Sequence, residues 1–369
     1  QAAHSLERGA RRALGEAINC LQIPLADGGE GTVEAIVKGA GGTIQNAQVR
    51  GPLGEEVHAQ WAILNDGRAV IEMAQASGLT LALPEKRNAL HASSYGTGEL
   101  ICAALNAGCH KILLGIGGSA TTDGGVGAFQ ALGVRFLDAD GNELLPGGAA
   151  LRDLHRIELD SLDARLHGCE ITVLCDVTNP LHGPHGAAFV YGPQKGATPK
   201  QVQILDEALQ NFADVTAQTS GKDYRNVPGA GAAGGIGFGL MSFLNARLKP
   251  GIETILEVTH FAEKLENADL VLTAEGSLDA QTLSGKTIAG LCHAAHKAKN
   301  GRGVPVIAFG GAVRLSGAQL DDLGLLSAFS IANAPLSLEQ CLFNADELLA
   351  DAAERALRLW KGLTLAPNE

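Results

Sequence analysis

The stretch T-T-D-G-G-V-G-A-F, Thr121 to Phe129, follows a largely apolar run and predicts a strand, a glycine-rich loop and the start of a helix. The run before it, Lys111–Ile116, is the expected strand, and Gly124–Leu132 is the expected helix. Nearly the same string, A-D-G-G-E-G-T, occurs at Ala26 to Thr32 after the apolar run Cys20–Leu25. Repeated strand–loop–helix order is typical of α/β proteins with parallel sheets, so the sequence predicts an α/β fold.

The composition fits a globular protein of about two domains, with 369 residues of which 46% are hydrophobic and 18% charged. A net charge of −12 argues against nucleic acid as a partner, although a small anionic substrate is still possible. No apolar run reaches the ~20 residues of a membrane-spanning helix. The seven scattered cysteines predict reduced thiols in a cytoplasmic protein. Since Gln1 already lies in a helical pattern, we expect the natural start upstream; the oligomeric state is not predicted.

The domain organisation follows from a change of pattern along the chain. Strand-like segments at Thr43–Val49, Glu56–Leu64 and Ala69–Met73, with a hairpin turn at Asn65-Asp66-Gly67, predict an antiparallel section. The last third returns to strand–loop–helix order. We therefore expect one doubly wound parallel-sheet domain, formed by residues 1–42 and 261–369. A second α/β domain with a mixed sheet, residues 43–260, would be inserted into it.

The acidic glycine-rich loops carry the first chemical indication. Ligands bind at the carboxyl ends of parallel strands, where free amides at helix N-termini attract anions. An aspartate there repels phosphate unless Mg²⁺ lies between them or the carboxylate accepts a proton from a hydroxyl. Such a loop suits phosphate with a metal, or phosphate with an alcohol. The alternative is that Asp27 and Asp123 are N-caps and the glycines serve turn geometry, which is the favoured interpretation of each loop taken singly.

Further polar clusters at predicted strand ends favour a phosphate-binding role for these loops over a purely structural one. Carboxylates, lysines and glycine-rich loops are the groups that phosphoryl transfer uses. The clusters contain the candidate catalytic residues Asp123, Asp176, Lys195, Glu275, Asp279 and Lys286, of which Glu275 and Asp279 are also the candidate magnesium ligands. The candidate residues for binding substrate or nucleotide are Asp27, Gly28, Gly29, Glu30, Gly31, Thr32, Ser119, Gly124, Gly125, Asn179, Gln194, Gly231, Gly276 and Gly285.

Other motifs do not support a different chemistry. Gly285-Lys286-Thr287 ends like a P-loop, but Ala280 stands where its first glycine should be. Gly229 to Gly234 matches G-x-G-x-x-G but follows no apolar strand, which weakens an NAD-dependent interpretation. His293 and His296 lack further ligands at a recognised metal-site spacing. Glu275 with Asp279 could indicate glycoside hydrolysis, but the scarcity of Trp and Tyr argues against a sugar-binding cleft.

A series of segments in the same order resembles the bacterial glycerate kinases of the first type across nearly the whole chain. The segments are P-L-A-D-G-G-E-G-T-V-E-A, E-M-A-Q-A-S-G-L, G-T-G-E-L-I, I-G-G-S-A-T-T-D-G-G-V-G, C-D-V-T-N-P-L, G-P-Q-K-G-A, G-A-G-A-A-G-G-I-G and E-G-S-L-D-A-Q-T-L-S-G-K. The resemblance implies ATP-dependent, Mg²⁺-assisted phosphorylation of D-glycerate (R-glycerate) at its 2-hydroxyl. It also implies a flavodoxin-like domain interrupted by a second α/β domain, with the active site in the cleft between them.

Two departures from that family limit what the resemblance transfers. The family begins with a strand and an aspartate–serine–aromatic–lysine loop, and this chain starts after them. Ser277 stands where relatives often carry a basic residue, so that residue's role cannot be carried over.

Within this interpretation Lys195 and Lys286 would neutralise charge on the transferred group. Asp176 would accept the proton of the substrate hydroxyl, Asn179 would position the substrate, and Glu275 or Asp279 would hold Mg²⁺. The alternatives are phosphorylation at the 3-hydroxyl and a non-catalytic, two-lobed protein that binds a small carboxylate.

Overall fold

A β-hairpin opens the larger sheet of the molecule. Strand β1 (Gly42–Arg50) pairs antiparallel with β2 (Glu56–Leu64) over its whole length, and the Asn65-Asp66-Gly67 turn leads into β3 (Ala69–Glu72), antiparallel to β2. The computed structural model describes residues 1–26, 28–284 and 286–364. The predicted antiparallel section is therefore present.

The rest of this sheet is parallel. Strand β3 pairs with β4 (Lys111–Gly115), β4 with β7 (Glu170–Leu174) and β7 with β8 (Arg247–Lys249), giving the order β1-β2-β3-β4-β7-β8. β3 is buried along its whole length, and β4 is buried after Lys111, as expected for parallel strands covered on both faces. Because these strands run in one direction, the loops that follow Glu72, Gly115 and Leu174 leave the sheet at one edge.

Helices and a small second sheet accompany the six strands. They are α2 (Thr32–Ala40), α3 (Ala74–Ser77), α4 (Tyr95–Asn106), α5 (Val126–Ala131), β5 (Arg135–Leu137), β6 (Arg156–Glu158), α6 (Ala187–Tyr191), α7 (Pro199–Ser220), α8 (Ala232–Leu244) and α9 (Gly251–Val258), together with the short 3₁₀ helices η1 (Leu79–Leu81), η2 (Pro84–Lys86), η3 (Gly148–Asp153), η4 (Ala164–Gly168) and η5 (Pro193–Lys195).

A three-stranded parallel sheet, ordered β11-β10-β9, organises the remaining residues. Its strands are β9 (Val271–Leu278), β10 (Val306–Val313) and β11 (Ser327–Ser330), and the helices around it are α1 (Ala2–Leu14), α10 (Phe261–Leu265), α11 (Ala280–Ser284), α12 (Lys286–Gly301), α13 (Gly317–Leu323), α14 (Leu338–Phe343) and α15 (Ala345–Thr364). Val306 and Ala308 of β10 pack in a core with Leu291 of α12, whereas Ile307 and Phe309 pack in another with α15. Both faces of β10 are thus buried.

The chain groups into two compact units, each described separately below. Unit 1 comprises Gln1–Leu25 and Ile255–Glu369, and unit 2 comprises Ala26–Thr254. These limits differ from the expected ones, since residues 26–42 group with the middle of the chain and residues 255–260 with its last part. The first difference has a clear cause, because the amide groups at the start of α2 donate to Glu72 in β3.

A cluster of phenylalanines fills part of the unit 2 core, although aromatic residues make up only 4% of the chain. Phe129 and Phe243 meet edge to face with ring centroids 4.9 Å apart, and Phe212 meets Phe238 in the same way at 5.3 Å. Phe136 contacts both Phe212 and Phe243. These rings tie α5, α7 and α8 together, and so fix the helices whose first residues adjoin the loops at the sheet edge.

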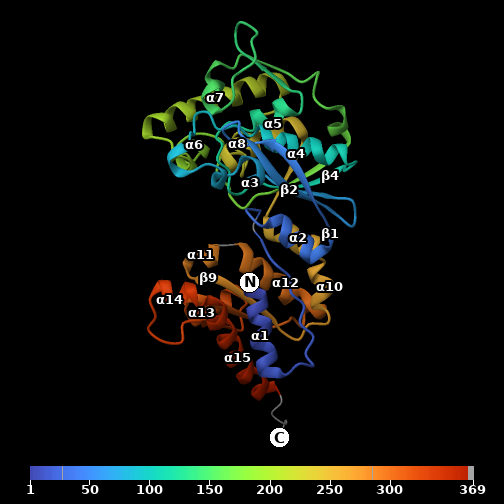
Figure 1. Ribbon diagram of the computed structural model, residues 1–369, viewed down its shortest axis with the longest axis vertical. Coiled ribbons are helices and arrows are strands. Elements are labelled where there is room, and N and C mark those ends of the chain that lie inside the picture. Colours follow the sequence, from blue (N-terminus) through green and yellow to red (C-terminus); the bar gives the residue numbers. More distant parts are fainter. Residues whose placement is uncertain (27, 285, 365–369) are drawn as a thin grey trace. The chain divides into compact units, whose positions relative to one another are not determined.

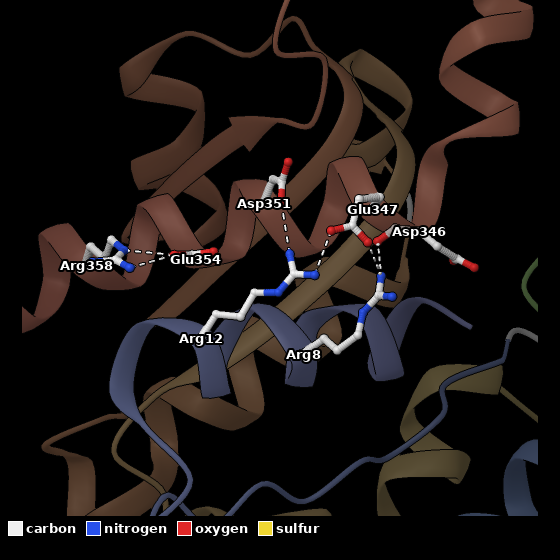
Figure 2. A network of polar contacts seen from close by, with 7 residues as sticks. All are labelled: Arg8, Arg12, Asp346, Glu347, Asp351, Glu354 and Arg358. Carbon is white, nitrogen blue, oxygen red and sulfur yellow. Dashed lines mark hydrogen bonds and ion pairs between the residues drawn. The ribbon is translucent and has the colours of Figure 1, made fainter.

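Helices α1 and α15, from the two ends of unit 1, lie side by side (Figure 1). Apolar side chains of both helices pack in the core of unit 1, and Figure 2 shows the ion pairs that join α1 to α15. Arg12 reaches Glu347 at 2.7 Å and Asp351 at 3.0 Å, and Arg8 reaches Glu347 at 3.2 Å. Exposed ion pairs contribute little free energy, so we assign the stability of this contact to the apolar packing and its register to the charges.

The apolar run Cys20–Leu25 is not a strand, contrary to expectation. Ile23 and Leu25 pack against the core that contains Leu291, so the run is held by side-chain packing without strand pairing. Its apolar character determined neither full burial nor the backbone hydrogen bonds, since Leu21 is 62% exposed and the other five residues are half-buried. No helix in the described part of the chain has the length and apolar character needed to cross a membrane.

Gly9 permits the close approach of α1 to α15. A Cβ added there would lie 2.3 Å from the carbonyl oxygen of Ala350 and 2.7 Å from the Cβ of Ala353. We expect Gly9→Ala to lower the free energy of unfolding of unit 1 by about 1–3 kcal/mol, because the helices must separate. Trp360 of α15 packs in this core and reports unfolding by fluorescence in a Trp61→Phe background.

Gly317→Ala is the matched control, because nothing lies within 4 Å of its added Cβ in α13. It should leave unit 1 unchanged or slightly stabilised. Equal effects of the two substitutions would contradict the close-approach interpretation.

Candidate active site

The carboxylate of Asp123 is buried and fully engaged by its own chain. Its Oδ2 accepts hydrogen bonds from the amide and hydroxyl of Ser94, each 2.8 Å away, and from the amide of Gly127 at 3.3 Å. Its Oδ1 accepts from the amide of Gly125 at 3.1 Å. The favourable position of a carboxylate at a helix N-terminus explains this arrangement. Asp123 therefore caps α5 and joins it to the segment before α4.

A different carboxylate holds the N-terminus of α2. Glu72, 1% exposed at the end of β3, accepts hydrogen bonds from the amides of Gly31 (3.2 Å) and Val33. Burial raises the pKa of Glu72, and these amide donors act against that rise. In both glycine-rich loops, amides expected to bind phosphate thus already donate to a protein carboxylate. This changes the role we assign to Gly31 and Gly125 from binding an anion to placing the residues around them.

The two glycine-rich loops lie close to one another at the edge of the six-stranded sheet. The amide of Gly117, just beyond β4, donates to the carbonyl of Gly28 at 3.0 Å. Within the first loop, the hydroxyl of Thr32 donates to the carbonyl of Gly29, and that of Thr80 donates to Glu30 at 2.9 Å. The similar strings in the sequence are therefore neighbours in the fold.

A third glycine-rich segment joins them at the start of α8. The amide of Gly124 donates to the carbonyl of Gly234 at 3.0 Å, and the amide of Gly231 donates to the carbonyl of Asn179 at 2.9 Å. Gly234 has φ +77°, and a Cβ there would lie 2.0 Å from the carbonyl oxygen of Thr121. Only glycine fits this position, so the G-x-G-x-x-G match is explained by close packing of loops.

Lys195 is the most deeply buried of the predicted basic residues whose side chains the structure describes. It is 2% exposed, and its Nζ donates to Ser119 Oγ at 3.0 Å and to the carbonyl oxygen of Thr121 at 2.5 Å. Burial lowers the pKa of Lys195 to about 7, while the nearby charge of Asp123 acts in the opposite direction. Lys195 lies buried beside the loop that precedes α5. A bound anion would favour the charged ammonium form of this lysine, and the two groups would interact strongly.

Two buried hydroxyls beside this lysine lack a partner in the part of the chain that the structure describes. Thr121 and Thr122 are each 0% exposed, and no described residue forms a hydrogen bond with either Oγ1 atom. Buried hydroxyls are normally satisfied, so these two atoms are exceptions in the core. Together with Lys195 and Ser119 they form a donor-rich set, which is the chemistry that a phosphate or a carboxylate requires.

Asp176 and Asn179 follow β7 at the same edge. Asp176 Oδ1 accepts from the amide of Gly251, the first residue of α9, at 3.2 Å. Asn179 donates to the carbonyl of His185 at 2.8 Å and accepts from the hydroxyl of Tyr191 at 2.7 Å. Both side chains thus have roles in shaping the loops after β7.

Unit 1 carries a separate polar group on and just after β9. Glu275, Gly276 and Ser277 were predicted to follow a strand that ends at Ala274, but they lie within β9, and Asp279 follows it. Asp279 accepts from Ser277 Oγ at 2.9 Å, and the hydroxyl of Thr282 donates to Glu275 Oε2 at 3.2 Å. The amide of Asp279 donates to Thr282 at 3.2 Å, and Gly276 is exposed between the two carboxylates. Ser277 therefore orients Asp279 directly. Oxygen ligands of this kind suit Mg²⁺, although no group of three or more His, Cys, Asp or Glu able to hold a metal occurs among the described residues.

The structure accordingly divides the predicted site residues into two groups. The sheet edge of unit 2 brings together Gly28, Gly29, Glu30, Gly31, Thr32, Ser119, Asp123, Gly124, Gly125, Asp176, Asn179, Gln194, Lys195 and Gly231, whereas Glu275, Gly276 and Asp279 lie in unit 1. Asp27, Gly285 and the side chain of Lys286 lie outside the described residues.

Comparison with known proteins settles the family. The model of the "Glycerate kinase family" matches residues 1–361. The chain belongs to the glycerate kinase family. A glycerate kinase of Halalkalibacterium halodurans is 47% identical over 96% of this chain and 92% of its own length. The glycerate 2-kinase of Escherichia coli K12 is 44% identical over 97% and 91%.

A crystal structure described as a glycerate kinase 2, from Salmonella typhimurium LT2, resembles this fold with a TM-score of 0.86. It has 43% sequence identity and covers 99% of this chain and 95% of that one. These findings confirm the resemblance seen in the sequence and the prediction of an enzyme, a glycerate kinase. Membership also implies ATP as phosphate donor.

Sequence reasoning missed Glu72 and Ser94, which hold the two glycine-rich loops of this kinase. Glu72 was recognisable as a single carboxylate at the end of the apolar strand A-V-I-E, where an unpaired charge would be costly. Nothing in the sequence pattern around Ser94 indicates that its partner is Asp123. It was one hydroxyl in a segment that contains several.

The lowered pKa of Lys195 predicts a pH-dependent stability. Between about pH 7 and the ordinary lysine pKa of 10.5, the unfolded chain binds more protons than the folded one, so the free energy of unfolding rises with pH over this window. We expect wild type to gain up to about 3 kcal/mol between pH 7 and 9.5 relative to Lys195→Met. Trp61, buried in unit 2, reports unfolding in a Trp360→Phe background.

The exposed Lys200→Met variant is the control and should follow the wild-type pH dependence. If Lys195→Met also follows it, the lysine is not the group that titrates.

Proposed function

We propose that this chain transfers the γ-phosphoryl group of ATP to the 2-hydroxyl of D-glycerate, giving 2-phosphoglycerate and ADP by in-line displacement. The observation that carries the proposal is the buried ammonium of Lys195, at the end of η5, which donates to Ser119 and Thr121 in the loop between β4 and α5. Family membership supplies the substrate class, and the name of the Escherichia coli relative supports the 2-position.

Lys195 would act on the charge that develops on the transferred group. A desolvated ammonium interacts strongly with an anion, and the unpartnered hydroxyls of Thr121 and Thr122 lie in the same loop. Binding of an oxyanion there would raise the pKa of the lysine and keep it charged at neutral pH. The attraction between the charged lysine and the transferred phosphoryl group would then be strongest in the transition state, as catalysis requires.

For the proton of the substrate hydroxyl we propose Asp176 as acceptor. Its position after β7, at the edge that also carries Lys195, supports this role, and its bond to the amide of Gly251 would fix its orientation. Asn179 and Gln194 would line the same edge.

Magnesium would neutralise the nucleotide phosphates when bound. We propose Glu275 and Asp279 as the carboxylates that hold it, because Thr282 and Ser277 orient their oxygens. For unit 1 we further propose the flavodoxin-like, doubly wound arrangement, which the burial of both faces of β10 supports. The proposed metal-holding carboxylates belong to unit 1, and Asp176 and Lys195 belong to unit 2.

The reaction is tested by adding D-glycerate to the protein with ATP and Mg²⁺. We expect ADP release that depends on D-glycerate, and a ³¹P NMR spectrum of the product that matches 2-phosphoglycerate. A product spectrum of 3-phosphoglycerate would overturn the proposed regiochemistry. ADP release unaffected by D-glycerate would overturn the function itself.

The role of Asp176 is tested by Asp176→Asn, which keeps the size of the side chain and removes the base. We expect kcat to fall at least about 100-fold, with a much smaller change in the KM for ATP. Asp206→Asn is the matched control, since Asp206 also accepts one backbone amide, that of Gly183 at 2.8 Å. Near-normal turnover of Asp176→Asn would exclude Asp176 as the base.

A further inference from the structure

Arg87 lies against the loop that carries Lys195, and the function described above gives it no role. It follows η2, and its Nη1 donates to the carbonyl of Gln194 at 3.2 Å. A Cβ added to Gly196 would lie 3.1 Å from the Cβ of Arg87. The arginine thus contacts residues on both sides of Lys195.

The other edge of this guanidinium has no protein partner. Its Nε is buried without a hydrogen-bond acceptor, and neither an acceptor for Nη2 nor a carboxylate in ion-pair range of Arg87 occurs in the described part of the chain. Arg152, Arg302, Arg314 and Arg355 likewise lack a carboxylate in ion-pair range among the described residues, but of the arginines there only Arg87 has a buried nitrogen without an acceptor. Many of the chain's other arginines form ion pairs with carboxylates, among them Arg8, Arg11, Arg12, Arg50, Arg68, Arg135, Arg156, Arg165, Arg225, Arg247 and Arg358.

The segment after Arg87 is anchored at two further points. The amide of Ala149 donates to the carbonyl of Leu90 at 3.1 Å, and the amide and hydroxyl of Ser94 donate to Asp123. One short segment therefore connects Arg87 to the carboxylate that caps α5. The backbone of Arg87 is placed by packing and hydrogen bonds, which makes its side chain suitable for specific binding.

We propose that the edge formed by Nε and Nη2 of Arg87 binds the carboxylate of the hydroxy-acid substrate, and so makes this enzyme specific for acids. The inference rests on the proposed function. Nε–H and one Nη–H point in parallel, which matches the two oxygens of a carboxylate. Since Nη1 is held by Gln194, Nε and Nη2 form the edge that has no acceptor among the described residues.

Charge supports the assignment. Asp123, the buried carboxylate that Ser94 at the end of this segment contacts, already accepts four hydrogen bonds, so it has little capacity to neutralise a further cation. Lys195, a compact ammonium, would serve the transferred phosphoryl group, and Arg87, a planar fork, would serve the carboxylate. The two anionic groups of the reaction would then each have a dedicated cation.

The test compares wild type with Arg87→Gln and Arg87→Lys, using D-glycerate and its neutral amide, D-glyceramide. We expect Arg87→Gln to lower kcat/KM for D-glycerate by about 10- to 100-fold, as for loss of a charge-assisted bond, with less than about a twofold change in the KM for ATP. The preference of wild type for D-glycerate over D-glyceramide should nearly disappear in Arg87→Gln. Arg87→Lys should recover only part of it, because the charge is kept and the fork is lost.

Calorimetric titration without ATP separates this inference from the proposed function. Wild type should bind D-glycerate more tightly than D-glyceramide, and Arg87→Gln should lose that difference even if phosphoryl transfer fails in the assay. A rise in the KM for ATP with D-glycerate binding unchanged would overturn the proposal and assign the edge to a phosphate. An unchanged preference for the acid, with a loss in kcat alone, would also overturn it, since Arg87 would then only hold the Gln194 carbonyl. Equal thermal midpoints of Arg87→Lys and wild type show that folding is preserved.

Discussion

The first amides of a helix need acceptors, and in unit 2 two buried carboxylates meet that requirement. Asp123 accepts from the amides of Gly125 and Gly127 and also from Ser94, while Glu72 accepts from the first residues of α2. Without these carboxylates, several backbone donors would be buried and unsatisfied. The position of both glycine-rich loops depends on them, and so does the position of Ser119 and Thr121, the acceptors for Lys195.

This constraint also determines the electrostatic character of the sheet edge. Its buried carboxylates are engaged by backbone donors, whereas Lys195 and Arg87 have hydrogen-bond acceptors but no direct ion pair among the described residues. Both cations thus lie at an edge that also carries Asp123 and Asp176, in a chain of net charge −12. The global charge of a protein does not decide the potential at such a site.

The order and type of most helices and strands could be predicted from the sequence, because apolar runs indicate the elements and the glycines between them indicate where each element ends. The strands at Thr43–Val49, Glu56–Leu64 and Lys111–Ile116 are present at nearly the expected bounds. The prediction of a strand at Cys20–Leu25 was wrong, because an apolar run does not specify a partner for its backbone hydrogen bonds. The sequence pattern also could not predict that Asp123 and Glu72 accept hydrogen bonds from backbone amides. These bonds depend on which amides lie beside the two carboxylates, and those amides come from distant parts of the chain.

The pairing of α1 with α15 has a consequence for biosynthesis. Unit 1 is built from the first residues and the last third of the chain, whereas unit 2 is continuous in sequence. As the polypeptide leaves the ribosome, unit 2 can fold as soon as its own residues have emerged, while the apolar stripe of α1 must wait for a helix that is made after the whole of unit 2. Early folding of the inserted unit draws the two separated parts together, and this lowers the entropy lost when the ends of unit 1 finally meet.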